Sequence, residues 1–281
     1  MKLMRVHTKW SFACCLLVLW LVSAQTAHAV VDWEDSFEYA NQAALEAVWA
    51  SSCVGNGSIL FPSTDRAHSG SKSLKKIYRG HQAGPEGPAT PGYQSCWIDR
   101  DLSSVSRTVW VRYWMYMDNF TVNQIGTKTS AIYSNGIDPV SNGWGSPWFE
   151  MMHGTPNLGM NVRPIMLATI DSENVYGGMV PQNQWACIEA QLIEADPGVD
   201  NGVMRQWING TPTLNKTTQR MGRTQDTTLA WQFIREYVQD GMGTIYIDDW
   251  AVSRDTRIGC LASSGNGDTA PPSVPTGLSI R

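Results

Sequence analysis

The sequence predicts an all-β protein, an antiparallel sandwich or jelly roll. Short runs rich in β-branched and aromatic residues recur along the chain, and clusters of Gly, Asn, Ser, Pro and Asp separate them. Long segments with the 3.6-residue period of an amphipathic helix do not interrupt these runs. Many short strands with such turns between them are typical of two antiparallel sheets packed face to face.

The expected elements begin with one short helix and continue as strands. The segment NQAALEAVWA, residues 41–50, is the one stretch with a helical composition. Strands are expected at residues 73–78, 95–102, 107–117, 127–134, 147–153, 185–193, 202–208, 229–238 and 243–253. A strand-rich region of about 235 residues is large for an immunoglobulin-like sandwich and suits a jelly roll.

Both ends of the chain differ in composition from the strand-rich part. Residues 1–29 contain basic residues, an apolar run and the small-x-small sequence AHA, which predict a secretory signal peptide cleaved after Ala29. The apolar run falls short of the ~20 residues that a membrane-spanning helix needs. Residues 261–281 are a Gly/Ser linker followed by a Pro-rich segment. The expected organisation is a signal peptide, one domain over residues 30–260, and a tail.

The charge of the mature chain excludes some partners. Loss of Lys2, Arg5 and Lys9 with the signal peptide lowers the basic count from 21 to 18 against 25 acidic residues, a net charge of −7. Such a balance argues against nucleic acid or an anionic membrane as partner. With the signal peptide, we expect an exported protein, and we expect it to be a monomer.

Four cysteines remain after cleavage, and an even number in an oxidising compartment suggests two disulfides with three possible connectivities. We favour Cys53–Cys96 and Cys187–Cys260, because each pair closes one half of the domain. A zinc site is not expected, since no two of these cysteines lie close in sequence.

Three expected strands have a second face that is polar and aromatic. Alternation places apolar residues on one face of residues 109–117 and 186–192, as a core requires. The opposite faces, together with one face of residues 231–237, carry the residues we predict to bind carbohydrate: Trp110, Trp114, Tyr116, Trp185, Glu189, Gln191, Trp231 and Arg235. Aromatic rings cover the apolar sides of sugars, and carboxyl or amide groups bind hydroxyls. The alternatives are a solvated outer face, or a strand buried on both sides in which Arg112 pairs with Glu150 or Glu189.

Several motifs resemble secreted concanavalin A-like jelly rolls of the polysaccharide-lyase-like and laminin-G-like kind. WACIE followed by DNGVMRQWINGT resembles their hairpin W-x-x-x-E … dG-x-x-x-x-W-x-dG, and GTIYIDDWAVSRDTRIGC resembles their last strand. DWEDSFEYA and AHSGSKSLKK fit the first strands, so the resemblance covers most of residues 31–260. DTAPPSVPTGLSI resembles the start of a fibronectin type III module of secreted bacterial proteins. These motifs are structural and imply the fold more strongly than a reaction.

The resemblance implies an enzyme that cleaves an acidic polysaccharide by β-elimination. Such a lyase needs a base, a group that stabilises the enolate, and an acid. His153 is the predicted base, although a lone His at a strand end is more often a structural hydrogen-bonding group. The predicted carboxylate clamps and proton donors are Arg112, Lys128, Tyr133, Arg163 and Tyr237. The chain departs from the family in lacking the alginate-lyase motifs R-x-E-L-R, Q-I-H and Y-F-K-A-G.

Other catalytic classes have little support in the sequence. The glucanase motif E-x-D-x-x-E is absent, as are G-x-S-x-G, H-E-x-x-H and a P-loop. The resemblance also implies a structural Ca²⁺ between the first and last strands, with oxygen ligands from Glu34, Asp35, Asp248 and Asp249. The alternative is that these carboxylates cap turns or face solvent.

We therefore expect a secreted jelly roll that handles a polysaccharide in a groove on its concave sheet. One alternative is a non-catalytic carbohydrate-binding module of a larger secreted protein. Another is an adhesion domain of the laminin-G or MAM type that binds protein. A cluster of His153 with a Tyr and an Arg would favour the enzyme, and exposed Trp residues without such a cluster would favour the binding module.

Overall fold

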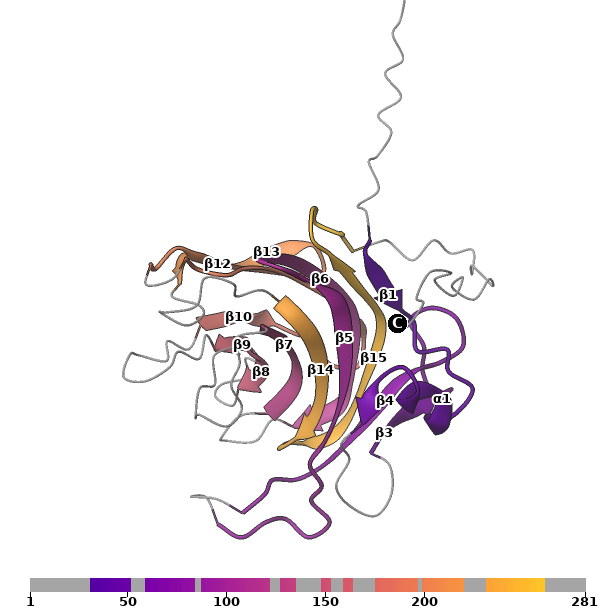
Figure 1. Ribbon diagram of the computed structural model, residues 1–281. Coiled ribbons are helices and arrows are strands. Elements are labelled where there is room, and N and C mark those ends of the chain that lie inside the picture. The colour runs from indigo at the N-terminus through magenta and orange to yellow at the C-terminus, as the bar shows by residue number, and fades with distance from the viewer. Residues whose placement is uncertain are drawn as a thin grey trace, which may run out of the picture.

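The computed structural model describes residues 31–51, 59–83, 87–121, 127–134, 148–152, 159–163, 175–196, 199–219 and 231–260. Two antiparallel sheets make up most of this part of the chain (Figure 1). The predicted all-β jelly-roll sandwich is confirmed. The predicted signal peptide and C-terminal tail lie outside the described residues.

The first sheet, sheet A, runs in the order β13-β12-β11-β6-β15-β4-β3, and β1 pairs with the end of β15. Its strands are β1 (Trp33–Asp35), β3 (Leu60–Ser63), β4 (Ser73–Arg79), β6 (Thr108–Thr121), β11 (Trp185–Ile193), β12 (Gly202–Ile208), β13 (Thr211–Gln219) and β15 (Met242–Ser253). The long strands β6 and β15 pair at the centre of this sheet.

The second sheet, sheet B, runs in the order β10-β9-β8-β7-β14-β5-β2. Its strands are β2 (Ala50–Ser51), β5 (Cys96–Ser106), β7 (Thr127–Ser134), β8 (Trp148–Met152), β9 (Gly159–Arg163), β10 (Val175–Met179) and β14 (Trp231–Gln239). Both sheets are curved, and sheet B lies inside the curve of sheet A (Figure 1). The face of sheet B that points away from sheet A is therefore the concave face of the domain.

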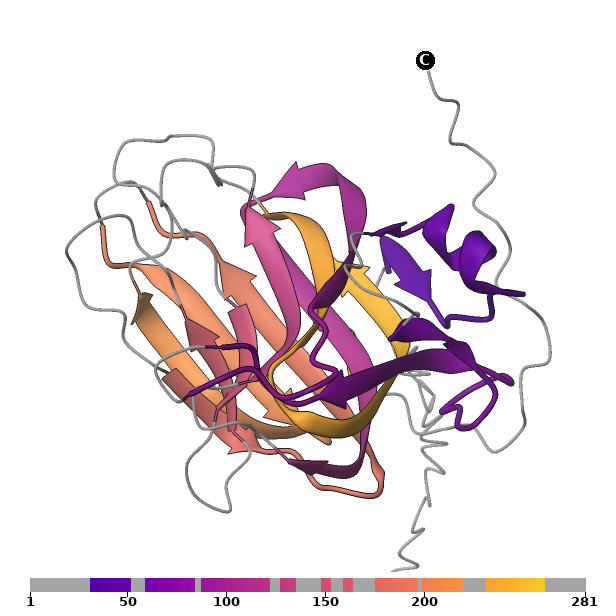
Figure 2. The ribbon, with the colours of Figure 1, turned by 90° about the horizontal axis from the view of Figure 1, so that it is seen from below.

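The core lies between the sheets and follows the predicted alternation. Every second residue of β6 and β11 belongs to the main core cluster: Val109, Val111, Tyr113, Met115, Met117, Ala186, Ile188, Ala190 and Leu192. Sheet B contributes Ile98, Ile132 and Ile234 to the same cluster. The two layers that enclose these side chains are seen from below in Figure 2.

Helix α1 (Gln42–Glu46) lies within the stretch where a helix is expected. The Asn41 side chain caps it by accepting a hydrogen bond from the backbone N–H of Ala44 at 3.0 Å. No helix in the described part of the chain has the length and apolar character needed to cross a membrane.

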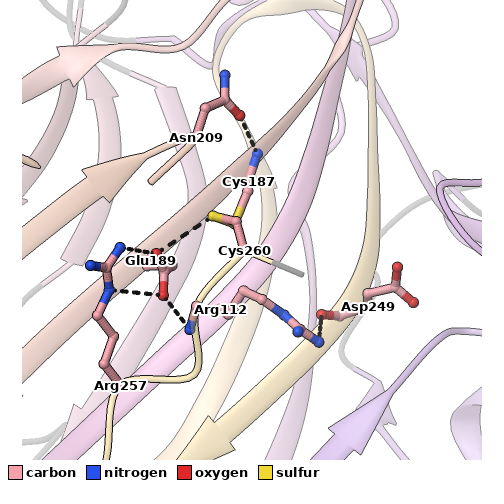
Figure 3. Close-up of a disulfide and its surroundings, with 8 residues drawn as sticks. Arg112, Cys187, Glu189, Asn209, Asp249, Arg257 and Cys260 are labelled. Atoms are coloured by element: carbon pink, nitrogen blue, oxygen red, sulfur yellow. Dashed lines mark hydrogen bonds and ion pairs between the residues drawn. A yellow bond between two sulfur atoms is a disulfide. The ribbon is translucent and has the colours of Figure 1, made fainter. Parts of the chain in front are cut away.

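A disulfide joins β11 to the segment that follows β15. Cys187 and Cys260 are bonded, as predicted, with their Cα atoms 5.9 Å apart and a sequence separation of 73 (Figure 3). Cys96 is also disulfide-bonded. Its predicted partner, Cys53, lies outside the described residues.

Candidate functional site

The predicted site residues lie on two different faces of the sandwich. Those of β6 and β11 lie on the face of sheet A that points away from the core, called here the outer face: Trp110, Arg112, Trp114, Tyr116, Trp185, Glu189 and Gln191. Lys128, Arg235 and Tyr237 belong to sheet B. The structure therefore does not bring all of the predicted residues together.

Side chains from the loop before β4 cover the aromatic rings at one end of the outer face. The His68 ring stacks on Trp114 with the centroids 3.7 Å apart, and the Arg66 guanidinium lies 4.2 Å from the centroid of Tyr116. The His68 Nδ1 atom lies 2.5 Å from a carboxylate oxygen of Asp249. A sugar would need ring faces that the His68 and Arg66 side chains already occupy, so the arrangement favours a structural role.

The C-terminal segment covers the other end of the outer face. The Glu189 carboxylate, 1% exposed, accepts hydrogen bonds from Arg257 and from the backbone N–H of Gly259 (Figure 3). The Arg257 guanidinium in turn lies 4.3 Å from the ring centroid of Trp207, which stacks on Trp110. Glu189 therefore holds the C-terminal segment next to the disulfide.

Arg112 lies between these two covered regions. Its side chain is buried, and its Nη2 atom donates to the backbone carbonyl of Asp249 at 3.3 Å (Figure 3). Burial lowers the pKa of Arg112, while the neighbouring carboxylates act in the opposite direction. Its predicted partner Glu189 pairs with Arg257 instead. Arg112 belongs to sheet A, whereas Tyr237, with which it was expected to act in catalysis, belongs to sheet B.

The concave face of sheet B carries an arginine of β14 that its neighbours fix in position. Arg235 of β14 is the register partner of Asp99 on β5, and two of its nitrogens donate to the two Asp99 oxygens at 2.5 and 2.6 Å. A third nitrogen donates to the Tyr237 hydroxyl at 3.2 Å. The side chains of Arg235 and Asp99 are 23% and 27% exposed, respectively, so the pair is accessible from the concave side.

Three aromatic rings surround Arg235. Its guanidinium carbon lies 5.3, 5.6 and 5.4 Å from the ring centroids of Trp97, Phe233 and Tyr237, respectively. These rings and Ala131 form a cluster of their own. The residues of β5 and β14 that alternate with them, such as Ile98 and Ile234, belong to the main core. Lys128 joins the same face, because its Nζ atom lies 5.8 Å from the Tyr237 ring centroid. We call this set, with Asp99, the concave-face cluster.

Trp231 corrects the predicted facing of β14. It was expected on the same face as Arg235, yet it is 1% exposed, belongs to the main core and donates from its indole nitrogen to the carbonyl of Arg107. The pairing of β14 with both neighbours shifts register between Trp231 and Phe233. Such a bulge reverses the alternation, so Trp231 and Arg235 point to opposite faces of sheet B.

The remaining predicted catalytic residues are placed only by backbone register. His153 lies outside the described residues. Tyr133 pairs with Phe233 across β7 and β14, and Arg163 falls in the register row that contains Arg235 and Trp148. Their strands belong to sheet B, so these positions lie on the same sheet as the concave-face cluster.

The four predicted calcium ligands do not form one oxygen shell. Asp35 accepts hydrogen bonds from Trp49, Tyr39 and the backbone of Phe37, and Glu34 is exposed. Asp248 accepts from the backbone N–H groups of His68 and Ser69, and burial, with the charge of Asp249, raises its pKa to about 8. Among the described residues, no three of these carboxylates converge on a point. The calcium prediction therefore has no support from their placement.

Sequence reasoning missed Trp97 and Asp99. Both lie in SCWIDRDL, which was expected to be a strand and is part of β5. Alternation puts Trp97 and Asp99 on one face of the strand and Ile98 on the other. The first face therefore carries an aromatic ring beside a carboxylate. That pattern would have identified them as site candidates.

Comparisons with known proteins agree on the fold. No protein-family model matches the chain, and no curated protein sequence matches it. Among solved structures, the cellulose-induced protein Cip1 is similar with a TM-score of 0.53 and 16% identity, over 81% of this chain and 99% of that one. The PL-14 alginate lyase of Aplysia kurodai is similar with a TM-score of 0.56 and 13% identity, over 80% of this chain and 100% of that one.

A third similar structure is the endo-β-1,4-glucuronan lyase of the fungus Trichoderma reesei. Its TM-score is 0.51 at 11% identity, over 79% of this chain and 95% of that chain. Identities this low speak for the fold alone. The chain thus has the concanavalin A-like jelly-roll fold that the motifs in its sequence resemble, as found in polysaccharide lyases.

Proposed function

Starting from this lyase-like jelly roll, we propose that the protein binds an acidic polysaccharide across the concave face of sheet B. The observation that carries the proposal is Arg235, which Asp99 fixes in position among three aromatic rings. A guanidinium binds carboxylates with defined geometry, and aromatic faces cover the apolar sides of sugar rings. Lys128 adds a second cation on the same face.

The outer face of sheet A supports binding less well. There the rings of Trp114, Tyr116 and Trp207 lie against His68, Arg66 and Arg257 of the same chain. On the concave face, the cation and the rings come from neighbouring strands of one sheet, with Arg235 about one quarter exposed. A polysaccharide lying along this face would meet both a carboxylate-binding group and rings.

Similar structures support the class of ligand. By their names, two of the similar proteins act on alginate and glucuronan, which are acidic polysaccharides. A variant of the alginate lyase Aly36B, similar with a TM-score of 0.50 and 14% identity over 81% of this chain and 98% of that one, was solved with an alginate tetrasaccharide. We carry over only the ligand class, an acidic glycan.

Cleavage by β-elimination is the second candidate function. The contact between Arg235 and the Tyr237 hydroxyl favours it, because it joins a carboxylate-binding group to a proton-transfer group. In this reaction a base takes the proton next to the uronate carboxylate, the electron pair forms a carbon–carbon double bond, and the glycosidic oxygen leaves with a proton. Arg235 would stabilise the enolate and Tyr237 would donate the proton, with His153 the base expected from the sequence.

We also place the protein outside the cell. The Cys187–Cys260 disulfide supports this, because disulfides persist in oxidising compartments. The signal peptide expected over residues 1–29 agrees with an extracellular polysaccharide as ligand. Mass spectrometry of the N-terminus of the exported protein would test cleavage after Ala29.

The experiment that tests the function is incubation of the purified protein with alginate, glucuronan, pectate and glycosaminoglycans. Binding is measured by affinity electrophoresis, and β-elimination by the ultraviolet absorbance of the unsaturated uronate. Binding with a rise in absorbance is the expected result for a lyase. Binding without it would make the protein a carbohydrate-binding module, and failure to bind any of them would leave the adhesion-domain alternative.

Matched variants locate the site. Arg235→Lys keeps the charge but loses the paired hydrogen bonds with Asp99, and we expect affinity to fall at least about tenfold. Arg257→Lys makes the corresponding change on the outer face, where Glu189 is the partner, and is expected to keep wild-type affinity. The reverse pattern would move the binding site to sheet A.

A further inference from the structure

The backbone is irregular at the point where Lys128 and Tyr237 meet. Between β7 and β14 the pairing shifts from Glu236 with Ser130 to Gln239 with Lys128, so β14 has one residue more than β7. Between β7 and β8 the pairing also shifts between Lys128 and Ser130. Bulges of this kind interrupt the ladder and redirect side chains, and they occur often next to functional sites.

Two side chains from the opposite sheet bond to carbonyls in this interrupted stretch. The Tyr78 hydroxyl of β4 lies 2.8 Å from the carbonyl oxygen of Tyr237 and 3.1 Å from that of Lys128. The Lys76 ammonium, also of β4, donates to the carbonyl oxygen of Thr129 at 2.6 Å. Sheet A therefore holds the bulged backbone of β7 and β14 from behind, through the core.

A buried carboxylate fixes Lys76 in turn. Glu236 lies between Arg235 and Tyr237 in sequence but points into the core, where it is fully buried. Its oxygens accept from Lys76 at 2.7 Å, from the Trp250 indole at 2.7 Å and from Ser130 at 2.9 Å. Burying an ion pair is costly, and an apolar substitute would often be as stable. The arrangement is thus better explained by what it positions than by its stability.

We propose that Tyr78, supported by the Lys76–Glu236 pair, is a positioning residue that sets the spacing of Lys128 and Tyr237 on the concave face. One hydroxyl reaches the backbone of both residues, so it fixes the distance between the strands that carry them. Tyr78 does not lie on the concave face and would touch no ligand. The inference rests on the proposed function, in which that face binds an acidic polysaccharide.

The test uses the full-length exported protein and the variant Tyr78→Phe. The substitution keeps the ring, which packs edge-on against Phe120 at 4.8 Å, and removes only the hydroxyl. Tyr246→Phe is the matched control, because Tyr246 is a buried tyrosine of sheet A whose ring packs with Tyr116 toward the outer face. Both variants are compared in affinity for alginate and glucuronan, and in hydrogen exchange of peptides covering β7 and β14.

For Tyr78→Phe we expect exchange about tenfold faster in β7 and β14 alone, and affinity about fivefold to tenfold lower. For Tyr246→Phe we expect neither change. If the wild-type protein cleaves the polysaccharide, Tyr78→Phe should slow the reaction by lowering kcat more than by raising KM. The reason is that the spacing of the two residues matters most in the transition state.

Unchanged exchange in β7 and β14 would overturn the proposal, as would faster exchange with wild-type affinity. A uniform rise in exchange over all strands would also overturn it, since that result indicates a purely structural tyrosine. If wild-type protein binds neither polysaccharide, the proposed function fails by itself, and the exchange pattern alone decides whether Tyr78 holds the two strands.

Discussion

The outer face of sheet A and the concave face of sheet B contain the same kinds of side chain in different settings. Both place a cation against aromatic rings, at 4.2 Å for Arg66 on Tyr116 and at 5.3 Å for Arg235 on Trp97. On the outer face Arg66 comes from a loop and Arg257 from the C-terminal segment, and both lie over rings of the sheet. On the concave face, cation and rings all stand on the strands themselves.

The difference separates a packing surface from a binding surface. Residues that reach over a sheet from distant parts of the chain pack on its rings and join the elements together, as Arg257 does through Glu189 and Trp207. Residues that stand on neighbouring strands are positioned by the ladder and keep their accessible side for a ligand. Composition alone does not distinguish the two surfaces, whereas the origin of each contacting side chain does.

The largest effect is expected from removing the disulfide that holds the cover of the outer face. The double variant Cys187→Ala/Cys260→Ala opens a loop of 73 residues, and chain-entropy arguments give a loss of about 4 kcal/mol in the free energy of unfolding. Urea unfolding measures this loss. Affinity for polysaccharide, measured on the fraction that remains folded, should stay unchanged, and a parallel loss of affinity would contradict the separation of the two faces.

A pair of tryptophan variants compares the faces directly. Trp97→Ala removes a ring beside Arg235, so we expect about tenfold weaker polysaccharide binding with little change in Tm. Trp114→Ala removes the ring on which His68 stacks. We therefore expect the free energy of unfolding to fall by about 1–3 kcal/mol, with a lower Tm, and the affinity to stay at the wild-type value. Calorimetry and affinity electrophoresis on both proteins make the comparison, which would fail if Trp114→Ala were the weaker binder.

A smaller effect concerns pH and lies at the end of the concave sheet. Burial raises the pKa of Asp240 above its ordinary value, although hydrogen bonds and the charge of Lys128 act against the shift. The stabilising contribution of the protonated form is present below the ordinary pKa and is lost as the pH rises through the raised pKa.

Asp240→Asn should therefore raise the free energy of unfolding at pH 7, on the order of 0.5 kcal/mol. Asn also tolerates the left-handed backbone at this position, where φ is 54°. The advantage should shrink as the pH falls toward 3, and urea unfolding at several pH values measures it. An advantage independent of pH would contradict this account.

The smallest effect is expected from calcium. Asp35, Asp248 and Asp249 already accept hydrogen bonds from protein donors, so a chelator should leave the Tm unchanged. Thermal unfolding in EDTA and in millimolar calcium makes the comparison. A calcium-dependent rise in Tm would support the ligand set expected from the sequence.

Strand faces could be predicted from the sequence because alternation is a local property. The core sides of β6 and β11 were assigned correctly, residue by residue, and the Cys187–Cys260 pair was confirmed. Membership of a sheet is not local. The sequences around Trp114 and Arg235 look alike, yet one strand pairs with β11 and β15 and the other with β5 and β7.

The positions of the bulges could not be predicted from the sequence either. A register shift beside Trp231 depends on the partner strands, so alternation continued through that point gave the wrong face. The cover of the outer face was also beyond prediction, because it depends on contacts between residues far apart in the chain, such as Arg66 and His68 with β6. Of the features missing from the sequence analysis, Trp97 and Asp99 could have been found from the local alternation of their own strand.

The disulfide has a consequence for how the molecule can be cut. Cys187 lies in sheet A, and the chain between the two cysteines passes through β12 and β13 of sheet A, β14 of sheet B and β15 of sheet A. These strands therefore belong to one covalently closed ring that threads both layers. A protease that cleaves once anywhere inside the ring would leave a single molecule, which would separate into two fragments only after reduction.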